Sequence, residues 1–274
     1  MALNRTADDP LLPRSDSFED FLTDLESSLE HNSLPSRALD VIFGLFDFVH
    51  PACNGDWMEF GVGGGASLNK AADYRASHCP AECPPVFGFD TFTGSPEHWV
   101  VDGHTIFHKG SFSMDGKLPE VAPNALLIKG LFADSIPPLL SQQRAWVQQY
   151  SEGWSKWGPQ SDAPLAYLHI DCELYSSARD VLTLMNHKIV PGTIILFDEL
   201  INYALYKDNE MKALWEWLQE TGAKLATVGT MGPVDNLPEG KIMDPVSETA
   251  HAQEFQSTAF VVMSKPGSTY NLWS

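Results

Sequence analysis

Basic residues are scarce in this chain, which has 17 lysines and arginines against 36 aspartates and glutamates and a formal net charge of −19. A nucleic-acid groove needs clustered lysine and arginine to bind phosphates. The composition therefore argues against nucleic acid as a partner, and against an anionic membrane surface. Such acidity favours solubility, or a saline setting, over a specific partner.

Long apolar runs and cysteines are also scarce. No run reaches the roughly 18 residues that a membrane span requires, and residues 1–14 lack the apolar segment of a signal peptide. Four cysteines in 274 residues are too few for a disulfide scaffold, so we expect a reducing, cytoplasmic setting. His78, Cys79 and Cys83 lack the second ligand pair of a zinc site and indicate a loop.

The chain is long and apolar enough, at 43% hydrophobic residues, for one sizeable domain. Residues 1–50 are predicted to form a tail and a helical cap, and residues 51–274 the main domain. The cap would contain two helices, the second over residues 35–49. The first carries apolar residues at helical spacing: Phe18, Phe21, Leu22, Leu25 and Leu29. Such a cap could cover a substrate site, form a dimer contact or simply complete the core.

Strand and helix patterns alternate along the main domain, which predicts an α/β sheet of mainly parallel strands. Thr91 to Leu118 is expected to be a long loop, and Pro191-Gly192 a turn. No helix separates the two final strands, so the last strand is predicted to be antiparallel. The expected strands are a first one ending near Phe60 and six others, at residues 86–90, 125–129, 165–171, 193–197, 223–230 and 258–263.

The first strand leads into the most informative stretch, D-W-M-E-F-G-V-G-G-G-A at residues 56–66. A strand, a glycine-rich turn and a helix form the usual unit for binding a nucleotide cofactor. Gly61, Gly63 and Ala66 fit the dinucleotide pattern G-x-G-x-x-A. Glu59, just before the glycines, instead suits a cationic ligand such as S-adenosylmethionine (SAM), which carries a sulfonium and an ammonium. A purely structural turn is the third interpretation.

Two further strand ends carry candidate cofactor residues. Asp90 ends the strand at residues 86–90, where an acidic residue meets the cofactor ribose in doubly wound sheets; a turn or helix-capping role is the alternative. Asp134 or Ser135 would cap the helix that follows the third strand. The long loop at residues 91–118 contains three histidines, of which one could enter the site: His98, His104 and His108.

Acidic residues also end the fourth and fifth strands, at Asp171 and at Asp198-Glu199. Carboxylates brought together at one sheet edge repel each other unless a cation lies between them. Oxygen ligands favour a hard ion, Mg²⁺ first, with Ca²⁺ or Mn²⁺ as alternatives. The competing interpretation gives these residues capping or ion-pairing roles.

Taken in order, these segments resemble one known family. They are W-M-E-F-G-V from Trp57, F-G-F-D-T-F-T-G from Phe87, P-E-H-W from Pro96, K-G-L-F-A-D-S from Lys129, H-I-D-C-E-L-Y-S-S from His169 and P-G-T-I-I-L-F-D-E from Pro191. The sequence is similar, over about residues 55–225, to the macrocin O-methyltransferase (TylF-type) family of class I SAM-dependent methyltransferases. The resemblance implies a Rossmann-like, seven-stranded, mostly parallel sheet with an antiparallel last strand.

The resemblance also implies roles for individual residues. Mg²⁺ ligands would be Asp171, Asp198 and Glu199, with Asp171 doubling as the catalytic base. The residues implied for SAM binding, together with their neighbours in the same motifs, are Glu59, Gly61, Val62, Gly63, Ser67, Asp90, Thr91, Asp134, Ser135 and Asp171.

This chain departs from the family at several positions. Glu173 stands where aspartate is usual, and the acidic pair is Asp198-Glu199 where the family's metal sites have two aspartates, so the match to those sites is incomplete. The Cys79–Pro85 loop and the Trp154–Pro159 segment look like insertions.

The function predicted from the sequence is Mg²⁺-assisted O-methylation of a small hydroxylated molecule, such as a sugar or a natural product, by an enzyme that could be a homodimer. One alternative is an N- or S-methyltransferase without a metal, with a loop histidine such as His98 as the catalytic residue. The others are a SAM-binding regulatory protein without turnover and a nicotinamide-dependent oxidoreductase.

Overall fold

The structure, a computed structural model, describes residues 11–31, 45–46, 49–141, 163–231 and 257–273. Seven strands form one sheet in the order β5-β2-β1-β6-β7-β9-β8. Their bounds are β1 Asp56–Phe60, β2 Val86–Asp90, β5 Ala125–Lys129, β6 Leu165–Ile170, β7 Ile189–Phe197, β8 Lys224–Met231 and β9 Ser257–Ser264.

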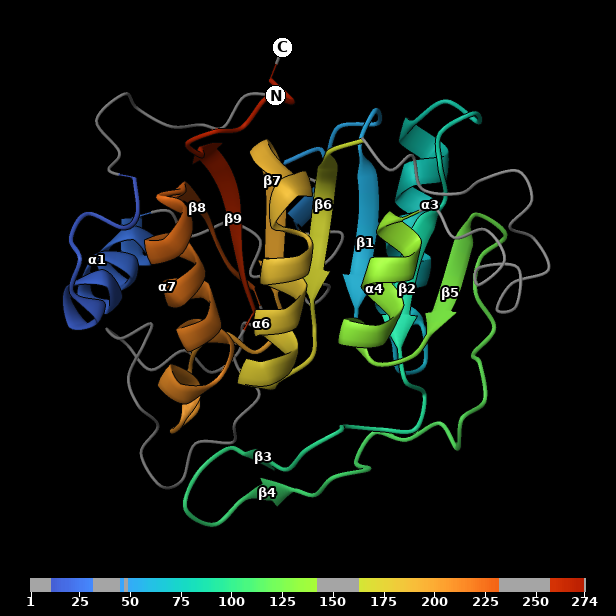
Figure 1. The fold of residues 1–274 in the computed structure, drawn as a ribbon, viewed down its shortest axis with the longest axis horizontal. Coiled ribbons are helices and arrows are strands. Elements are labelled where there is room, and N and C mark those ends of the chain that lie inside the picture. Colours follow the sequence, from blue (N-terminus) through green and yellow to red (C-terminus); the bar gives the residue numbers. More distant parts are fainter. Residues whose placement is uncertain (1–10, 32–44, 47–48, 142–162, 232–256, 274) are drawn as a thin grey trace.

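The pairing of these strands confirms the predicted fold class. β5, β2, β1, β6 and β7 are parallel neighbours, and β9 lies antiparallel between β7 and β8. The chain thus has the α/β sheet of a class I methyltransferase fold, including the reversed last strand. Because parallel strands end at the same edge, the loops after β1, β2, β5 and β6 gather on one side of the molecule (Figure 1).

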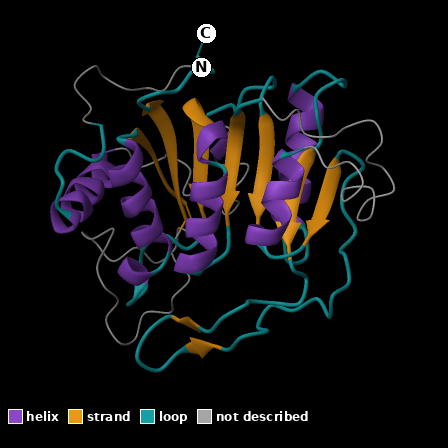
Figure 2. Cartoon of the chain, viewed as in Figure 1, coloured by secondary structure: helices purple, strands orange, loops and turns teal. Residues whose placement is uncertain are grey.

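Helices cover both faces of the sheet (Figure 2). α4 Phe132–Leu140, α6 Tyr175–Leu184 and α7 Glu210–Thr221 lie on one face, and α3 Ala66–His78 lies on the other. Short 3-10 turns precede β7 and α7, at Asn186–Lys188 and Tyr206–Asp208. Every residue of β1 is buried, which is typical of a central parallel strand enclosed between two helical layers.

The first predicted helix is confirmed as α1 Phe18–His31. It packs beside α7 and β8, where Phe18 and Phe21 place their rings 5.7 and 5.1 Å from that of Trp215. β8 is an edge strand, separated from β1 by β6, β7 and β9. The helix α1 therefore does not cover the loops after β1 and β2. The second predicted helix lies almost wholly outside the described residues, and the division at residue 50 stays a prediction.

The segment expected to be a long loop contains a hairpin, β3 Trp99–Val100 and β4 Ile106–Phe107. Trp99 is buried between Phe107 and Tyr203, with ring centroids 5.1 and 5.7 Å away. Leu205 donates a backbone hydrogen bond to Val101. The hairpin is therefore held by contacts from residues a hundred positions later, which local sequence patterns do not reveal.

The predicted turn at Pro191-Gly192 is wrong, because β7 continues through it. Gly192 adopts a φ of +98°, and Thr193 Oγ1 accepts the N–H of Val190 while donating to the carbonyl of Leu165. These bonds allow a bulge within a continuous strand.

The cysteines also differ from expectation. Cys53 and Cys79 form a disulfide, whereas Cys83 and Cys172 are free. The strand–turn–helix unit brings the residues before β1 next to the end of α3, which places these two cysteines together despite their separation of 26 residues. None of the described helices combines the length and apolarity needed to cross a bilayer.

Candidate functional site

A cavity of about 370 Å³ lies at the carboxyl ends of β1, β2 and β6. Its volume falls in the range of small-molecule sites, about 300–1,000 Å³. Six of the predicted cofactor residues line it: Gly61, Val62, Gly63, Asp90, Thr91 and Asp171.

Asp90 organises the glycine-rich loop. Its Oδ2 accepts the backbone N–H groups of Val62 and Gly63, each at 2.9 Å, and its Oδ1 accepts that of Phe92 at 2.7 Å. One carboxylate thus fixes the loop after β1 and the loop after β2. Because Asp90 also lines the cavity, it remains available to a ligand.

Gly61 is required by the close approach of β1 and β6. Its φ is +94°, and a Cβ at this position would lie 1.6 Å from the carbonyl oxygen of Asp171. The Asp171 N–H donates to the carbonyl of Phe60 at 2.9 Å. Glycine at this position therefore allows the backbone of Asp171 to sit directly beside the glycine-rich loop.

Glu59 occupies a different place from the one its motif suggested. Its side chain is fully buried and does not line the cavity. Ser67 Oγ donates to Glu59 Oε1 at 2.9 Å, and His169 Nδ1 contacts Glu59 Oε2 at 3.0 Å. Both carboxylate oxygens are thus used inside the protein, and direct contact of Glu59 or Ser67 with SAM stays a prediction.

The Asp134-Ser135 turn is likewise outside the cavity lining. Asp134 is exposed and Ser135 is buried. The residues just before them, Leu131, Phe132 and Ala133, line the cavity. Their apolar side chains offer a wall suited to a flat ring.

The predicted catalytic histidine, His98, is exposed and does not line the cavity. Its Nδ1 accepts the backbone N–H of Lys109 at 3.0 Å, which ties the two ends of the hairpin together. The neighbouring Glu97 lines the cavity instead, and Ser176 Oγ donates to its Oε1 at 2.7 Å. A catalytic role for His98 stays a prediction that these contacts do not support.

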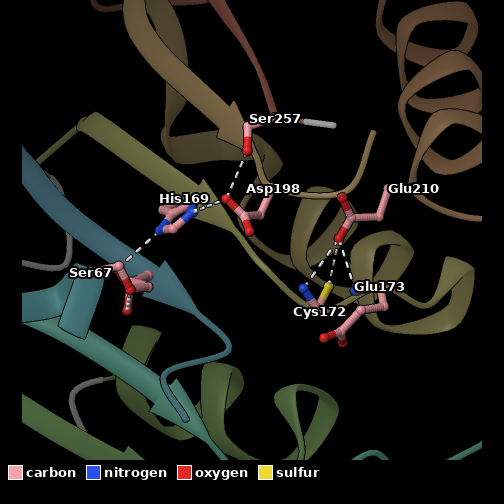
Figure 3. A network of polar contacts seen from close by, with 8 residues as sticks. Ser67, His169, Cys172, Glu173, Asp198, Glu210 and Ser257 are labelled. Carbon is pink, nitrogen blue, oxygen red and sulfur yellow. Dashed lines mark hydrogen bonds and ion pairs between the residues drawn. The ribbon is translucent and has the colours of Figure 1, made fainter. Parts of the chain in front are cut away.

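A buried charged network joins the ends of β1, β6 and β7 (Figure 3). His169, with a 1% exposed surface, lies between Glu59 and Asp198, whose Oδ1 is 3.9 Å from His169 Nε2. Ser257 Oγ donates to the same Asp198 oxygen at 3.0 Å. Burial alone lowers the pKa of His169, but the carboxylates of Asp198 and Glu59 outweigh it and raise that pKa well above its ordinary value. We therefore treat His169 as an imidazolium that neutralises its neighbours.

Three other carboxylates form a compact cluster beside this network. Oxygens of Asp171, Glu173 and Glu199 all lie within 4.8 Å of one another. The family resemblance implies Asp198 as a metal ligand, which stays a prediction; in the structure Asp198 contacts His169 and Ser257, and Glu173 lies with Asp171 and Glu199. Glu173 adopts a left-handed backbone conformation, with a φ of +57°, in the turn after β6.

The acidic cluster is electrostatically costly by itself. Burial, then repulsion by Asp198 and Asp90, raises the pKa of Glu173 to about 7. Burial and repulsion by Asp198 also raise the pKa values of Asp171 and Glu199 well above the ordinary range, and Glu199 Oε2 is buried without a hydrogen-bond partner among the described residues. Oxygens that share one hard divalent cation lie at most about 4–5 Å apart, which is twice the metal–oxygen distance. The donor set and its spacing thus fit such a cation.

Glu210, a residue that the sequence motifs do not mark, supports this cluster from α7 (Figure 3). It is fully buried, and its Oε1 accepts the N–H groups of Cys172 at 3.2 Å and Glu173 at 3.0 Å. Burial raises the pKa of Glu210 to about 8. Glu210 therefore holds the strained turn that carries Asp171 and Glu173.

Replacing Glu210 by alanine should lower the free energy of unfolding by about 2–4 kcal/mol, because two buried N–H groups lose their acceptor. Glu210→Gln keeps an amide oxygen at the same place and should lose clearly less. Urea unfolding of the two variants measures the difference. Equal losses would show that the N–H contacts are not what Glu210 contributes.

No protein-family model matches this chain, and no curated protein matches it. Solved structures do align with it. The crystal structure of the calicheamicin methyltransferase CalS11 aligns with a TM-score of 0.49 and 18% identity, over 94% of this chain and 88% of that one. An apo structure of CalS11, described as a TDP-rhamnose 3'-O-methyltransferase, gives 0.42 and 18%, over 87% and 80%. The O-methyltransferase NovP gives 0.41 and 16%, over 76% and 71%. These neighbours are methyltransferases, but the likeness is too distant to carry a function, and the fold assignment rests on the strand order.

Proposed function

We propose that this protein is a SAM-dependent O-methyltransferase that acts on a small hydroxylated molecule, such as a sugar or a natural product, with the help of a divalent cation. The observation that carries the proposal is the position of Asp90. Its carboxylate lines an acidic cavity and accepts hydrogen bonds from the N–H groups of Val62 and Gly63 in the glycine-rich loop.

The charge of the cavity favours a cationic ligand. Of its 19 lining residues, five are carboxylates and none is lysine or arginine. The five are Asp90, Glu97, Asp171, Glu173 and Asp180. SAM, with its sulfonium and ammonium groups, complements such a surface, since opposite charges attract most strongly where water is excluded.

A dinucleotide fits the same loop poorly. Its pyrophosphate needs free backbone N–H groups at the glycine turn and the helix start. Here the N–H groups of Val62 and Gly63 already donate to Asp90, so a pyrophosphate would meet a carboxylate instead of donors. This contact favours SAM over NAD(P).

The residues suggest how the transfer is arranged. SAM would supply an activated methyl group on its sulfonium. Asp90 would accept hydrogen bonds from the ribose hydroxyls, while Leu131 and Phe132 would lie against the adenine. Asp171, at the junction of the cavity and the acidic cluster, would orient the acceptor hydroxyl and take its proton.

We propose Asp171, Glu173 and Glu199 as the cation ligands, with Mg²⁺ as the first candidate and Ca²⁺ or Mn²⁺ as alternatives. A bound cation would stabilise negative charge as it develops on the acceptor oxygen. Asp198, which His169 neutralises, would stay outside the ligand set and hold the end of β7 in place.

Calorimetric titration with SAM and with NAD⁺ and NADP⁺ tests the cofactor. We expect SAM to bind with a dissociation constant in the micromolar range and the dinucleotides not to bind. Tight binding of a dinucleotide without binding of SAM would refute the proposal. Transfer of tritiated methyl groups from SAM to a panel of hydroxylated compounds then tests for turnover, which a regulatory protein would lack.

Metal binding should show a defined pH dependence. The folded protein raises the pKa of Glu173 from 4.5 to about 7, so the metal-free fold loses stability as pH rises through that interval. A cation offsets the repulsion and displaces the protons. We expect Mg²⁺ to raise the melting temperature by several degrees near pH 8 and by much less near pH 5.

Two variants and a chelator complete this test. Glu199→Gln should remove most of the Mg²⁺ effect, whereas Asp180→Asn, which removes a carboxylate elsewhere in the cavity, should retain it. EDTA should abolish methyl transfer and Mg²⁺ should restore it. Activity that survives chelation, or a melting shift that is the same at both pH values, would contradict the metal role.

A further inference from the structure

A second cavity, of about 500 Å³, opens beside the first. Three segments form it: the loop after β2, the residues after β4 and the end of β5. It shares five of its ten lining residues with the first cavity. The two cavities are therefore neighbouring parts of one cleft at the carboxyl edge of the sheet.

The charges of the two cavities are opposite. The second cavity is lined by Lys109 and Lys129 and by no carboxylate. The hydroxyl-bearing residues Thr91, Thr93 and Ser95 lie alongside them. Two lysines on one small surface are unusual in a chain of net charge −19.

Some cations of the described structure have a carboxylate partner. Lys188 pairs with Asp56 at 3.0 Å, and Lys207 pairs with Glu19 at 3.2 Å. Within the described residues no carboxylate forms an ion pair with Lys109 or Lys129. In a protein with 36 acidic side chains, two lysines that line one cavity without a carboxylate partner in the described part of the chain point to a ligand that supplies the negative charge.

The ammonium group of Lys129 and the backbone of Lys109 are each held by a hydrogen bond. Lys129 Nζ donates to the carbonyl of Gly116 at 2.6 Å, a single one of its three possible bonds. Glycine at position 116 leaves room for this nitrogen, because a Cβ there would lie 3.2 Å from Lys129 Nζ. The backbone of Lys109 is fixed by its N–H bond to His98 Nδ1. The cavity therefore offers at least one pre-positioned ammonium group.

We propose that this second cavity binds an anionic group, a phosphate or a carboxylate, between the ammonium groups of Lys109 and Lys129. The anion belongs either to the molecule that is modified in the first cavity or to a separate small ligand. The inference rests on the second cavity alone and does not require that SAM is the cofactor.

Calorimetry with inorganic pyrophosphate and with glucose 1-phosphate tests this site on the full-length protein. Lys109→Gln and Lys129→Gln should each weaken binding about tenfold, because each removes a charge-assisted contact. Lys117→Gln is the matched control, since Lys117 is exposed on the same segment and lies outside both cavities. It should bind as the wild type does.

The comparison of the two probes identifies the source of the anion. Tighter binding of glucose 1-phosphate, with the same sensitivity to the two lysines, supports an anion carried by the sugar-like acceptor. Equal or tighter binding of pyrophosphate supports a separate ligand. The inference is overturned if neither probe binds, or if the variants at positions 109 and 129 bind as well as Lys117→Gln. SAM affinity, measured in parallel, should be the same in all three variants as in the wild type. If the wild type does not bind SAM at all, only the proposed function is refuted, and the anion site is not.

Discussion

Replacing Asp171 by asparagine should reduce methyl transfer by about 10²–10⁴-fold, the range for loss of a positioned base, and leave SAM affinity almost unchanged. Asp171 lines the cavity and also belongs to the acidic cluster. Its carboxylate would thus serve two roles, as the base that takes the proton of the acceptor hydroxyl and as a ligand of the proposed cation. Its contribution to the glycine-rich loop comes from backbone atoms, which the substitution keeps: its N–H donates to Phe60, and its carbonyl lies against Gly61.

Single-turnover methyl transfer and calorimetry with SAM separate the two properties. Asp180→Asn provides the control, because it removes another carboxylate that lines the same cavity, from α6. It should retain most of the activity. A comparable loss of SAM affinity in Asp171→Asn would mean that Asp171 holds the cofactor and is not the base.

Replacing Asp90 by alanine should weaken SAM binding by about 10–100-fold, the effect of losing one or two hydrogen bonds to a charged group. The structure gives two reasons for this effect. Asp90 lines the cavity, where its carboxylate would accept the ribose hydroxyls. It also fixes Val62, Gly63 and Phe92 through their N–H groups, so the loop itself would lose its support.

Asp90→Asn distinguishes these contributions. Asparagine keeps one acceptor oxygen, so it should preserve part of the loop and bind SAM better than the alanine variant. Asp73→Ala, which removes an exposed carboxylate from α3, controls for net charge and should bind SAM normally. If Asp90→Ala binds SAM as tightly as Asp73→Ala does, Asp90 is not part of the cofactor site.

The sequence alone was sufficient to predict the sheet and part of the cavity. Alternating strand and helix patterns identify the seven strands, and the missing helix before β9 reveals the reversed strand. Because ligands bind where parallel strands end, the positions of Gly61, Asp90 and Asp171 in the chain already place them at one edge. These features depend on local periodicity and on topology, both of which can be read from a linear sequence.

The tertiary structure decided how the charged groups pair. Glu59 is next to the glycines in sequence, but its carboxylate turns toward His169 and Ser67, away from the cavity. Asp198 likewise faces His169, and Glu173 joins Asp171 and Glu199 because the turn after β6 takes a left-handed conformation. A buried charge is stable only with a partner, and the partner is whichever side chain the fold brings near.

Long-range contacts also decided which residues support the site. Glu210 reaches the turn at Cys172 and Glu173 from 38 and 37 residues away. Lys109, in the loop after β4, and Lys129, the last residue of β5, line the same second cavity. The sequence by itself thus determined the order of elements and the edge of the sheet at which the candidate site lies, because both follow from short-range pattern and strand direction. Which carboxylates form the acidic cluster and which contact His169 was decided only when the packed fold fixed the distances between them.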